Sequence, residues 1–279
     1  MGRGTSPAAE RPSGEDMLVD HHCHLDFPDF EATLEDVVAR AHAAGVGTMV
    51  TISTHIRRFE RLRAIIERQP NVYASIGTHP HHADEERGIP LSEIIAISRH
   101  PKVVAIGEAG LDYYYQKSSA QNQAEGFRTH IQAARETGLP LEIHTRDADA
   151  DTQAILMEEH AKGAFPAILH CYTGGRELAM RAVDLGHYVS FSGVVSFKKS
   201  DALRAIACEV PLDRILVETD APFLAPEPFR GRKNEPAYVT HTAQALAHAR
   251  GMTPEDFARA TTDNFFRLFT KAKRPDVRP

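Results

Sequence analysis

Eight short aliphatic or β-branched runs recur along the chain, each followed by a polar loop, and longer stretches with helical spacing lie between them. Alternating strand and helix patterns are typical of βαβ units, which place their strands in a parallel sheet. The predicted strands cover residues 17–20, 47–52, 72–77, 103–107, 139–143, 166–169, 188–191 and 215–218. Predicted helices between them include residues 31–44, 57–69, 120–137, 148–161 and 177–185.

The number and spacing of these units decide between an open doubly wound sheet and a closed barrel. Residues 17–270 divide into eight units of about 32 residues, close to the ~30 residues of a βαβ unit. No GxGxxG motif follows the first strand, and no GxxxxGK[ST] motif occurs, so the phosphate-binding signatures of open sheets are missing. We therefore predict an α/β fold of the (β/α)8 barrel class.

The domain organisation follows from the same pattern. We expect residues 1–16 to be a flexible leader, because glycine, proline, serine and charged residues occur there without periodicity. Residues 17–272 are expected to form a single barrel domain, and residues 273–279 a C-terminal tail.

Cysteine usage and hydropathy indicate the compartment. The three cysteines are odd in number and widely spaced, which is typical of a reducing compartment without a disulfide framework. No apolar run approaches the ~18 residues of a membrane span, and the N-terminus lacks a hydrophobic signal core. We expect a soluble cytoplasmic protein that does not associate with membranes.

Imidazole or carboxylate side chains follow six of the eight predicted strands. Active sites of (β/α)8 barrels lie at the C-terminal ends of the strands, where these side chains would meet. The segments are DHHCHLD at 20–26, GTHPH at 77–81, GEAGLD at 107–112, HTRDA at 144–148, HCYTG at 170–174 and ETDAP at 218–222. Such groups would repel or desolvate one another unless a cation collected them.

The first of these segments has chelate spacing. Side chains alternate along a strand, so His22 and His24 point the same way and can bind one ion, with Asp20 on the same face. Cys23 and Cys171 alternate with the histidines and are expected to be small buried residues of the barrel wall. Imidazole and carboxylate donors without thiolate suit Zn, Mn, Fe, Co or Mg.

These segments, with FSG at 191–193, RKNEP at 232–236 and NFFRLF at 264–269, resemble the TatD family of metal-dependent hydrolases within the amidohydrolase superfamily. The resemblance runs from Val19 to about Phe269. It implies a (β/α)8 barrel with a dinuclear divalent-metal site at the C-terminal ends of the strands. It assigns one ion to His22, His24, Glu108 and Asp220, and the other to Glu108, His144 and His170.

Three features of this ligand pattern stand out. Glu108 would bridge the two ions, where many relatives in the superfamily use a carboxylated lysine. His21 stands where a small or hydroxyl residue is usual, and alternation places it out of phase with the ligands. Glu142 stands where an aliphatic residue is expected. It precedes His144 by two residues, so it would lie beneath the metal or pair with a deep cation.

The resemblance implies a TatD-like deoxyribonuclease that cleaves phosphodiester bonds with a metal-activated hydroxide, using two divalent ions such as Mg, Mn, Zn or Co. Asp220 would be the general base. Glu218 precedes Asp220 by two residues, so it would lie on the same face but deeper in the barrel. It would act either as a base or as a hydrogen-bond partner of a ligand histidine. One alternative is an ester hydrolase that uses the same site, for example to remove D-amino acids from tRNA. Another alternative is a metal-binding interaction protein without catalytic activity.

Two further residues are expected to contact a phosphate. Arg146 is in phase with His144 and lies beyond it, where its guanidinium would fork onto a phosphate. Alternatively, Arg146 would form a salt bridge with Asp147 or Asp149 instead of binding a phosphate. His79 would contact the scissile phosphate or its neighbour, unless it is a turn histidine held by Pro80.

The expected substrate is nucleic acid, as single-stranded DNA or DNA ends. A net charge of −6 disfavours indiscriminate wrapping of duplex DNA. Cationic residues nevertheless cluster after the seventh and eighth strands, where they would guide a strand into the mouth. They are Lys198, Lys199, Arg230, Arg232 and Lys233. Candidate aromatic residues for base stacking are Tyr113, Tyr172 and Phe197.

Overall fold

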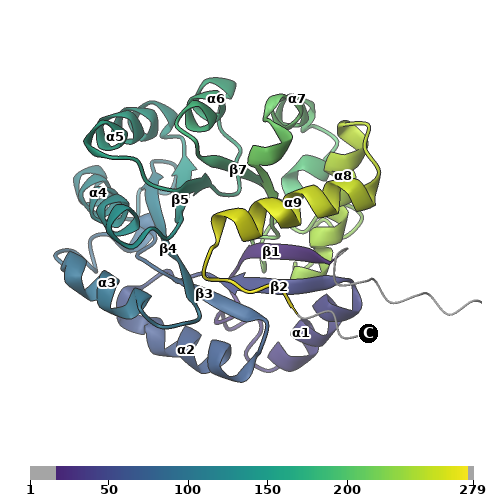
Figure 1. Cartoon of the computed structure of the whole chain (residues 1–279), viewed down its shortest axis with the longest axis horizontal. Helices are drawn as coiled ribbons and strands as arrows, with labels where there is room; N and C mark the ends of the chain where they lie inside the picture. The colour runs from purple at the N-terminus through teal and green to yellow at the C-terminus, as the bar shows by residue number, and fades with distance from the viewer. Residues whose placement is uncertain (1–16, 276–279) are drawn as a thin grey trace, which may run out of the picture.

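The computed structural model describes residues 17–275, and its eight strands form one parallel sheet in the order β1 to β8. The strands are β1 Leu18–Cys23, β2 Val46–Thr51, β3 Val72–Ile76, β4 Val103–Asp112, β5 Leu141–Arg146, β6 Ala167–Leu169, β7 Tyr188–Phe191 and β8 Ile215–Val217. Figure 1 shows these strands as an inner wall with the helices arranged around them. The predicted (β/α)8 barrel is confirmed.

The helices cover the outside of the barrel with their apolar faces. In α2, for example, Phe59, Leu62, Ile65 and Ile66 are buried, the spacing of a single helix face. The five predicted helices are present, with ends within three residues of the expected ones. The helices are α1 Leu34–Ala43, α2 Phe59–Arg68, α3 Leu91–Ser98, α4 Ala120–Thr137, α5 Asp149–Lys162, α6 Arg176–Asp184, α7 Asp201–Glu209, α8 Val239–Ala249 and α9 Pro254–Leu268.

The barrel closes between β8 and β1 just beyond the end of β8. His24 N donates to Ala221 O at 2.8 Å, and Asp220 N donates to His22 O at 2.9 Å. These bonds bring the backbone that carries His22 and His24 directly beside the backbone that carries Asp220. Closure of the barrel therefore assembles part of the site.

The last helix seals the other end of the barrel interior. Phe265 and Phe269, at and just beyond the end of α9, are fully buried and pack in one cluster with inward-facing strand residues such as Val19, Val104 and Leu216. Figure 1 shows α9 lying across the strands at this end. The polar groups deeper in the barrel therefore face an apolar floor rather than water.

Strand β4 continues farther than predicted, as far as Asp112. Its close pairing with β5 requires glycine at position 110, where φ is +147° and a Cβ would lie 2.0 Å from His144 O. The long strand carries both Glu108 and Asp112 into the mouth of the barrel.

The expected leader, residues 1–16, and residues 276–279 of the expected tail lie outside the described residues. Within residues 17–275, no helix is both long enough and apolar enough to cross a membrane.

Candidate metal centre

The side chain of Glu108 lies at the centre of the site, and its two oxygens face different groups of donors. Glu108 comes from the middle of β4 and is 1% exposed. The Oε2 atom faces residues on or just beyond β1 and β8, and the Oε1 atom faces residues on or just beyond β3, β5 and β6.

On the Oε2 side lie His22, His24 and Asp220. His22 Nε2 is 3.5 Å and His24 Nε2 3.9 Å from Glu108 Oε2. Asp220 Oδ1 is 3.3 Å from His24 Nε2 and 3.8 Å from His22 Nε2. The ligand atoms of these three residues lie within 4.8 Å of one another, a separation that one ion can span.

On the Oε1 side lie His144, His170 and His79. His170 Nε2 is 3.0 Å, His144 Nδ1 3.1 Å and His79 Nε2 3.3 Å from Glu108 Oε1. His79 Nδ1 also accepts a hydrogen bond from His81 N, so this side chain both caps the turn at Pro80–His82 (η2) and points into the centre.

The donors fit a metal ion better than they fit one another. His22 Nε2 and Glu108 Oε2 are buried and have no hydrogen-bond partner within residues 17–275. Buried polar atoms are rarely left without a partner, because each costs free energy. Both atoms point to the same place, among imidazole nitrogen and carboxylate oxygen donors, which suit divalent cations.

The charges of the site are strongly coupled. Burial by itself raises the pKa of Glu108, but His79, His170 and other nearby histidines hold it well below its usual range. Burial opposes protonation of His170, yet Glu108 and Glu218 raise its pKa well above the ordinary value. Burial and His170 lower the pKa of His22, but its contacts with Glu108 and Glu142 outweigh them and raise it to about 9. A metal must therefore displace protons from the histidines.

Asp112 is a functional candidate that the sequence interpretation missed. Its Oδ2 lies 3.1 Å from His144 Nε2 and 2.8 Å from His81 Nε2. The contact with Nε2 leaves Nδ1 of His144 facing the centre. Asp112 lies four residues after Glu108 on the same strand, and this in-phase spacing was the available signal.

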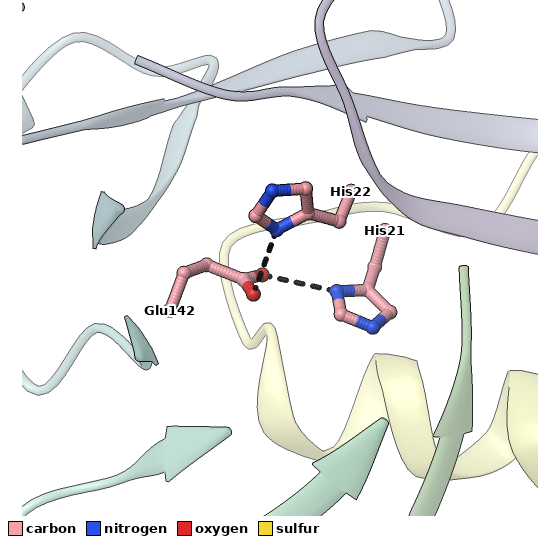
Figure 2. A group of neighbouring side chains, drawn as sticks. All are labelled: His21, His22 and Glu142. Atoms are coloured by element: carbon pink, nitrogen blue, oxygen red, sulfur yellow. Dashed lines mark hydrogen bonds and ion pairs between the residues drawn. The ribbon is translucent and has the colours of Figure 1, made fainter. Parts of the chain in front are cut away.

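A layer of polar side chains lies beneath the candidate ligands. Figure 2 shows the carboxylate of Glu142 between His21 and His22, with one contact to each ring. Glu218 is fully buried, with Oε1 3.2 Å from His170 Nδ1. Glu142 therefore lies beneath a candidate ligand and beside His21. Glu142 and Glu218 outweigh burial and raise the pKa of His21 to about 10.

The predicted phase of the first strand is wrong at two residues. His21 points into the barrel rather than away from it, and Asp20 lies in the seam between β1 and β8, where it accepts hydrogen bonds from Thr219. The reason is an irregularity in the pairing of β1 with β2 between Asp20 and Cys23, which breaks the simple alternation.

A cleft of about 790 Å³ opens over the β5 to β8 side of the centre and is lined by His144, Arg146, His170 and Asp220. The exposed guanidinium of Arg146 lies over the rings of Tyr114 and Tyr115, at 4.4 and 5.3 Å from their centroids. Within residues 17–275, no carboxylate pairs with Arg146, and Asp149 accepts a hydrogen bond from Gly175 N instead.

The structure corrects three expectations about the rim of the cleft. Tyr172 is buried, and Tyr113 is partly buried against the outer core with its hydroxyl donating to Asp151, so both rings belong to the barrel wall rather than to an open stacking surface. Cys23 is buried as predicted, but Cys171 is only half-buried and lines the cleft, because its backbone adopts a left-handed φ of 42° that breaks the alternation. Phe197 does line the cleft and lies beneath Arg230, 4.3 Å from its ring centroid.

The expected cationic residues are exposed on the loops that follow β7 and β8. They are Lys198, Lys199, Arg230, Arg232 and Lys233.

A separate group of possible metal donors lies outside the centre near η2. It consists of His55, His82 and Glu85.

Comparison with known proteins identifies the family. A model of the family described as TatD related DNase matches residues 19–270. The chain belongs to the TatD-related DNase family. A metal-dependent hydrolase of Escherichia coli K12, YcfH, is 44% identical over 256 residues, which cover 91% of this chain and 96% of YcfH.

Other members of the TatD-related DNase family extend this comparison. A protein of Citrobacter rodentium named 3'-5' ssDNA/RNA exonuclease TatD is 34% identical over 257 residues, covering 90% of this chain and 97% of that protein. The crystal structure of YjjV, a TatD homologue from Escherichia coli, superposes with a TM-score of 0.85 at 28% identity, covering 92% of this chain and 99% of YjjV. The predicted family is confirmed, and the chain is a metal-dependent hydrolase.

Proposed function

We propose that this chain is a two-metal phosphodiesterase that acts on single-stranded DNA or DNA ends. The observation that carries the proposal is the arrangement around Glu108, whose two oxygens face separate sets of donors. Two histidines and Asp220 lie on one side, and three histidines lie on the other. A single carboxylate shared in this way is suited to bridge two divalent ions.

The ligand sets follow the two sides of Glu108. His22, His24, Glu108 and Asp220 would hold one ion, and Glu108, His144 and His170 the other. When bound, such a pair supplies Lewis-acid activation of a phosphodiester and lowers the pKa of a water molecule. Mg, Mn, Zn and Co all suit these donors.

The chain's own residues then handle the proton and the substrate. One oxygen of Asp220 faces His22 and His24, and the residue also lines the cleft, where its carboxylate would accept a proton. Glu218 is enclosed beneath His170, so its position suits orientation of that ligand rather than direct proton transfer. His79 points its Nε2 toward Glu108, where it would contact a phosphate oxygen.

The rim of the cleft offers contacts for a single strand. Arg146 is held over the tyrosines and has no carboxylate partner among the described residues, so its guanidinium is free to bind a phosphate. Exposed rings at the rim, Tyr114, Tyr115 and Phe223, offer stacking surfaces for bases. The cationic loops after β7 and β8 would attract the backbone. The name of the Citrobacter relative, a single-stranded DNA/RNA exonuclease, supports this class of substrate.

The proposal is tested by incubating purified protein with Mg²⁺, Mn²⁺, Co²⁺ or Zn²⁺ and one of three substrates. Single-stranded DNA, RNA and D-aminoacyl-tRNA are followed over time, with Asp220→Asn as the inactive control. We expect metal-dependent release of nucleotides from DNA. Release of the amino acid from tRNA without nucleotide release would replace the phosphodiesterase by an ester hydrolase.

A further inference from the structure

The two residues that depart from the family pattern, His21 and Glu142, contact each other inside the barrel. They lie on β1 and β5, and His21 Nδ1 is 3.0 Å from Glu142 Oε1. Both are buried, with side chains 1% and 0% exposed. The resemblance leads us to expect a small or hydroxyl residue at position 21 and an aliphatic residue at position 142. In the structure each of these two unexpected polar side chains is a partner of the other.

Glu142 also contacts a proposed metal ligand. Its Oε2 lies 3.3 Å from His22 Nδ1, as Figure 2 shows. With Nδ1 donating to this carboxylate, the lone pair of His22 is left on Nε2, the atom that faces Glu108 without a hydrogen-bond partner. A carboxylate behind a ligand histidine fixes its tautomer and ring orientation and makes it a stronger ligand.

His21 connects this carboxylate to the one behind the second ligand. Its Nε2 is hydrogen-bonded to Ser190 Oγ at 2.6 Å and lies 3.1 Å from Glu218 Oε2. Glu218 Oε1 in turn contacts His170 Nδ1. One imidazole therefore joins the carboxylates that lie behind His22 and His170.

The surroundings make this link necessary. Glu142 and Glu218 are both fully buried, and Phe269 of the apolar floor lies beneath His21, with ring centroids 6.0 Å apart. Two buried carboxylates without a partner between them would repel each other and lose hydration.

We infer that His21 and Glu142 form one positioning unit, in which Glu142 orients His22 for its ion while His21 holds Glu142 and Glu218 in place. The inference rests on the proposed function, because it takes His22 and His170 as metal ligands. Neither residue reaches the cleft, so the unit acts through the ligands and not on the substrate.

The test is a double-mutant cycle of His21→Ser, Glu142→Leu and the variant with both changes, which removes both members of the buried pair. Melting temperature is measured on metal-free protein, and Co²⁺ affinity by absorption titration. We expect each single change to lower the melting temperature, and the double change to lower it by less than the sum, because either change alone strands a buried partner. Co²⁺ affinity should fall about 10- to 100-fold in Glu142→Leu and remain low in the double variant.

Two controls keep the outcome interpretable. Ile143→Val alters the neighbouring residue of β5, which packs in the outer core, and should lower stability slightly without changing Co²⁺ affinity. Glu142→Gln preserves the shape of the side chain and serves if Glu142→Leu does not fold, with the same expected loss of affinity. Additive melting losses, or native Co²⁺ affinity in the Glu142 variants, would overturn the inference. Failure of the unaltered protein to bind Co²⁺ would instead overturn the proposed metal centre.

Discussion

The imidazole rings of His22 and His170 stack face to face, with centroids 3.8 Å apart and planes within 3° of parallel. Each ring directs Nε2 toward a different oxygen of Glu108, and each has a buried carboxylate behind its Nδ1. The two halves of the proposed centre are therefore built in parallel, with one ligand and one orienting group on each side.

Removing the shared ligand should damage both halves. We expect Glu108→Gln to lose activity by a larger factor than any single histidine ligand variant, because the amide offers only one good donor oxygen and no charge to offset the repulsion between two ions. Metal content and kcat/KM are measured together. Glu159→Gln, at a buried glutamate of α5 paired with Arg128, Arg135 and Lys162, is the matched control. Two tightly held ions with near-normal turnover in Glu108→Gln would show that this residue does not bridge.

Arg146 should bind substrate without affecting the metals. Its stack on Tyr114 and Tyr115 places the guanidinium at the cleft, so Arg146→Ala is expected to lower kcat/KM on the order of 10²-fold, or roughly 3 kcal/mol, if the contact strengthens in the transition state. Metal content and melting temperature should stay unchanged. Arg63→Ala, on the exposed face of α2, provides the control. Unchanged kcat/KM in Arg146→Ala would remove this residue from the site.

Metal affinity should rise with pH. Contacts with Glu108 and Glu142 outweigh burial and raise the pKa of His22 to about 9, so this histidine holds a proton at neutral pH in the metal-free protein. Nearby carboxylates also raise the pKa values of His144 and His170. Each proton must leave before the nitrogen can bind an ion. Titration with Co²⁺ between pH 6 and 9 should therefore show tighter binding at higher pH, with proton release on binding. A Co²⁺ affinity that does not change with pH would mean that no protons leave these histidines when the ion binds.

A buried histidine outside the site should make the fold sensitive to acid. Burial, with a smaller effect of His160, lowers the pKa of His187 to about 3 from its ordinary value of 6.5. Below pH 6.5 the imidazole binds a proton in the unfolded chain, but in the folded chain it stays neutral until about pH 3. The free energy of unfolding therefore falls by roughly 1.4 kcal/mol per pH unit between these two values. Above pH 6.5 this contribution to stability is fully present.

Replacement of that imidazole should therefore protect the fold. We expect His187→Leu to flatten the dependence of the unfolding free energy on pH between 6 and 4, measured by urea denaturation. His42→Gln, at an exposed histidine of α1, should leave the slope unchanged. An unaltered slope in His187→Leu would show that His187 is not the acid-sensitive group.

The sequence predicted which residues the strand ends bring together. His24, Glu108, His144, His170 and Asp220 all lie on or just beyond strands whose ends meet at one mouth, so the strand pattern and family resemblance were enough to bring them together. Prediction failed for side chains whose direction depends on irregular backbone. The irregular pairing of β1 turned His21 inward and Asp20 into the seam, and the left-handed backbone at Cys171 turned its side chain toward the cleft.

Long-range packing was the second limit. Nothing local in residues 254–268 shows that α9 will close the barrel floor, because that placement depends on contacts with distant parts of the chain, including β1 at its beginning. The pairing of His21 with Glu142 is of the same kind, since each looked anomalous alone and the two are 121 residues apart.

The most direct test of the account counts ions and asks whether they share a ligand. Mn²⁺ is titrated into metal-free protein carrying His82→Gln, which removes the separate donor group near η2, and bound ions are followed by equilibrium dialysis and electron paramagnetic resonance. We expect two Mn²⁺ ions per chain, with a spin-coupled signal that disappears in Glu108→Gln. A single bound ion, or two uncoupled ions, would contradict a centre bridged by Glu108.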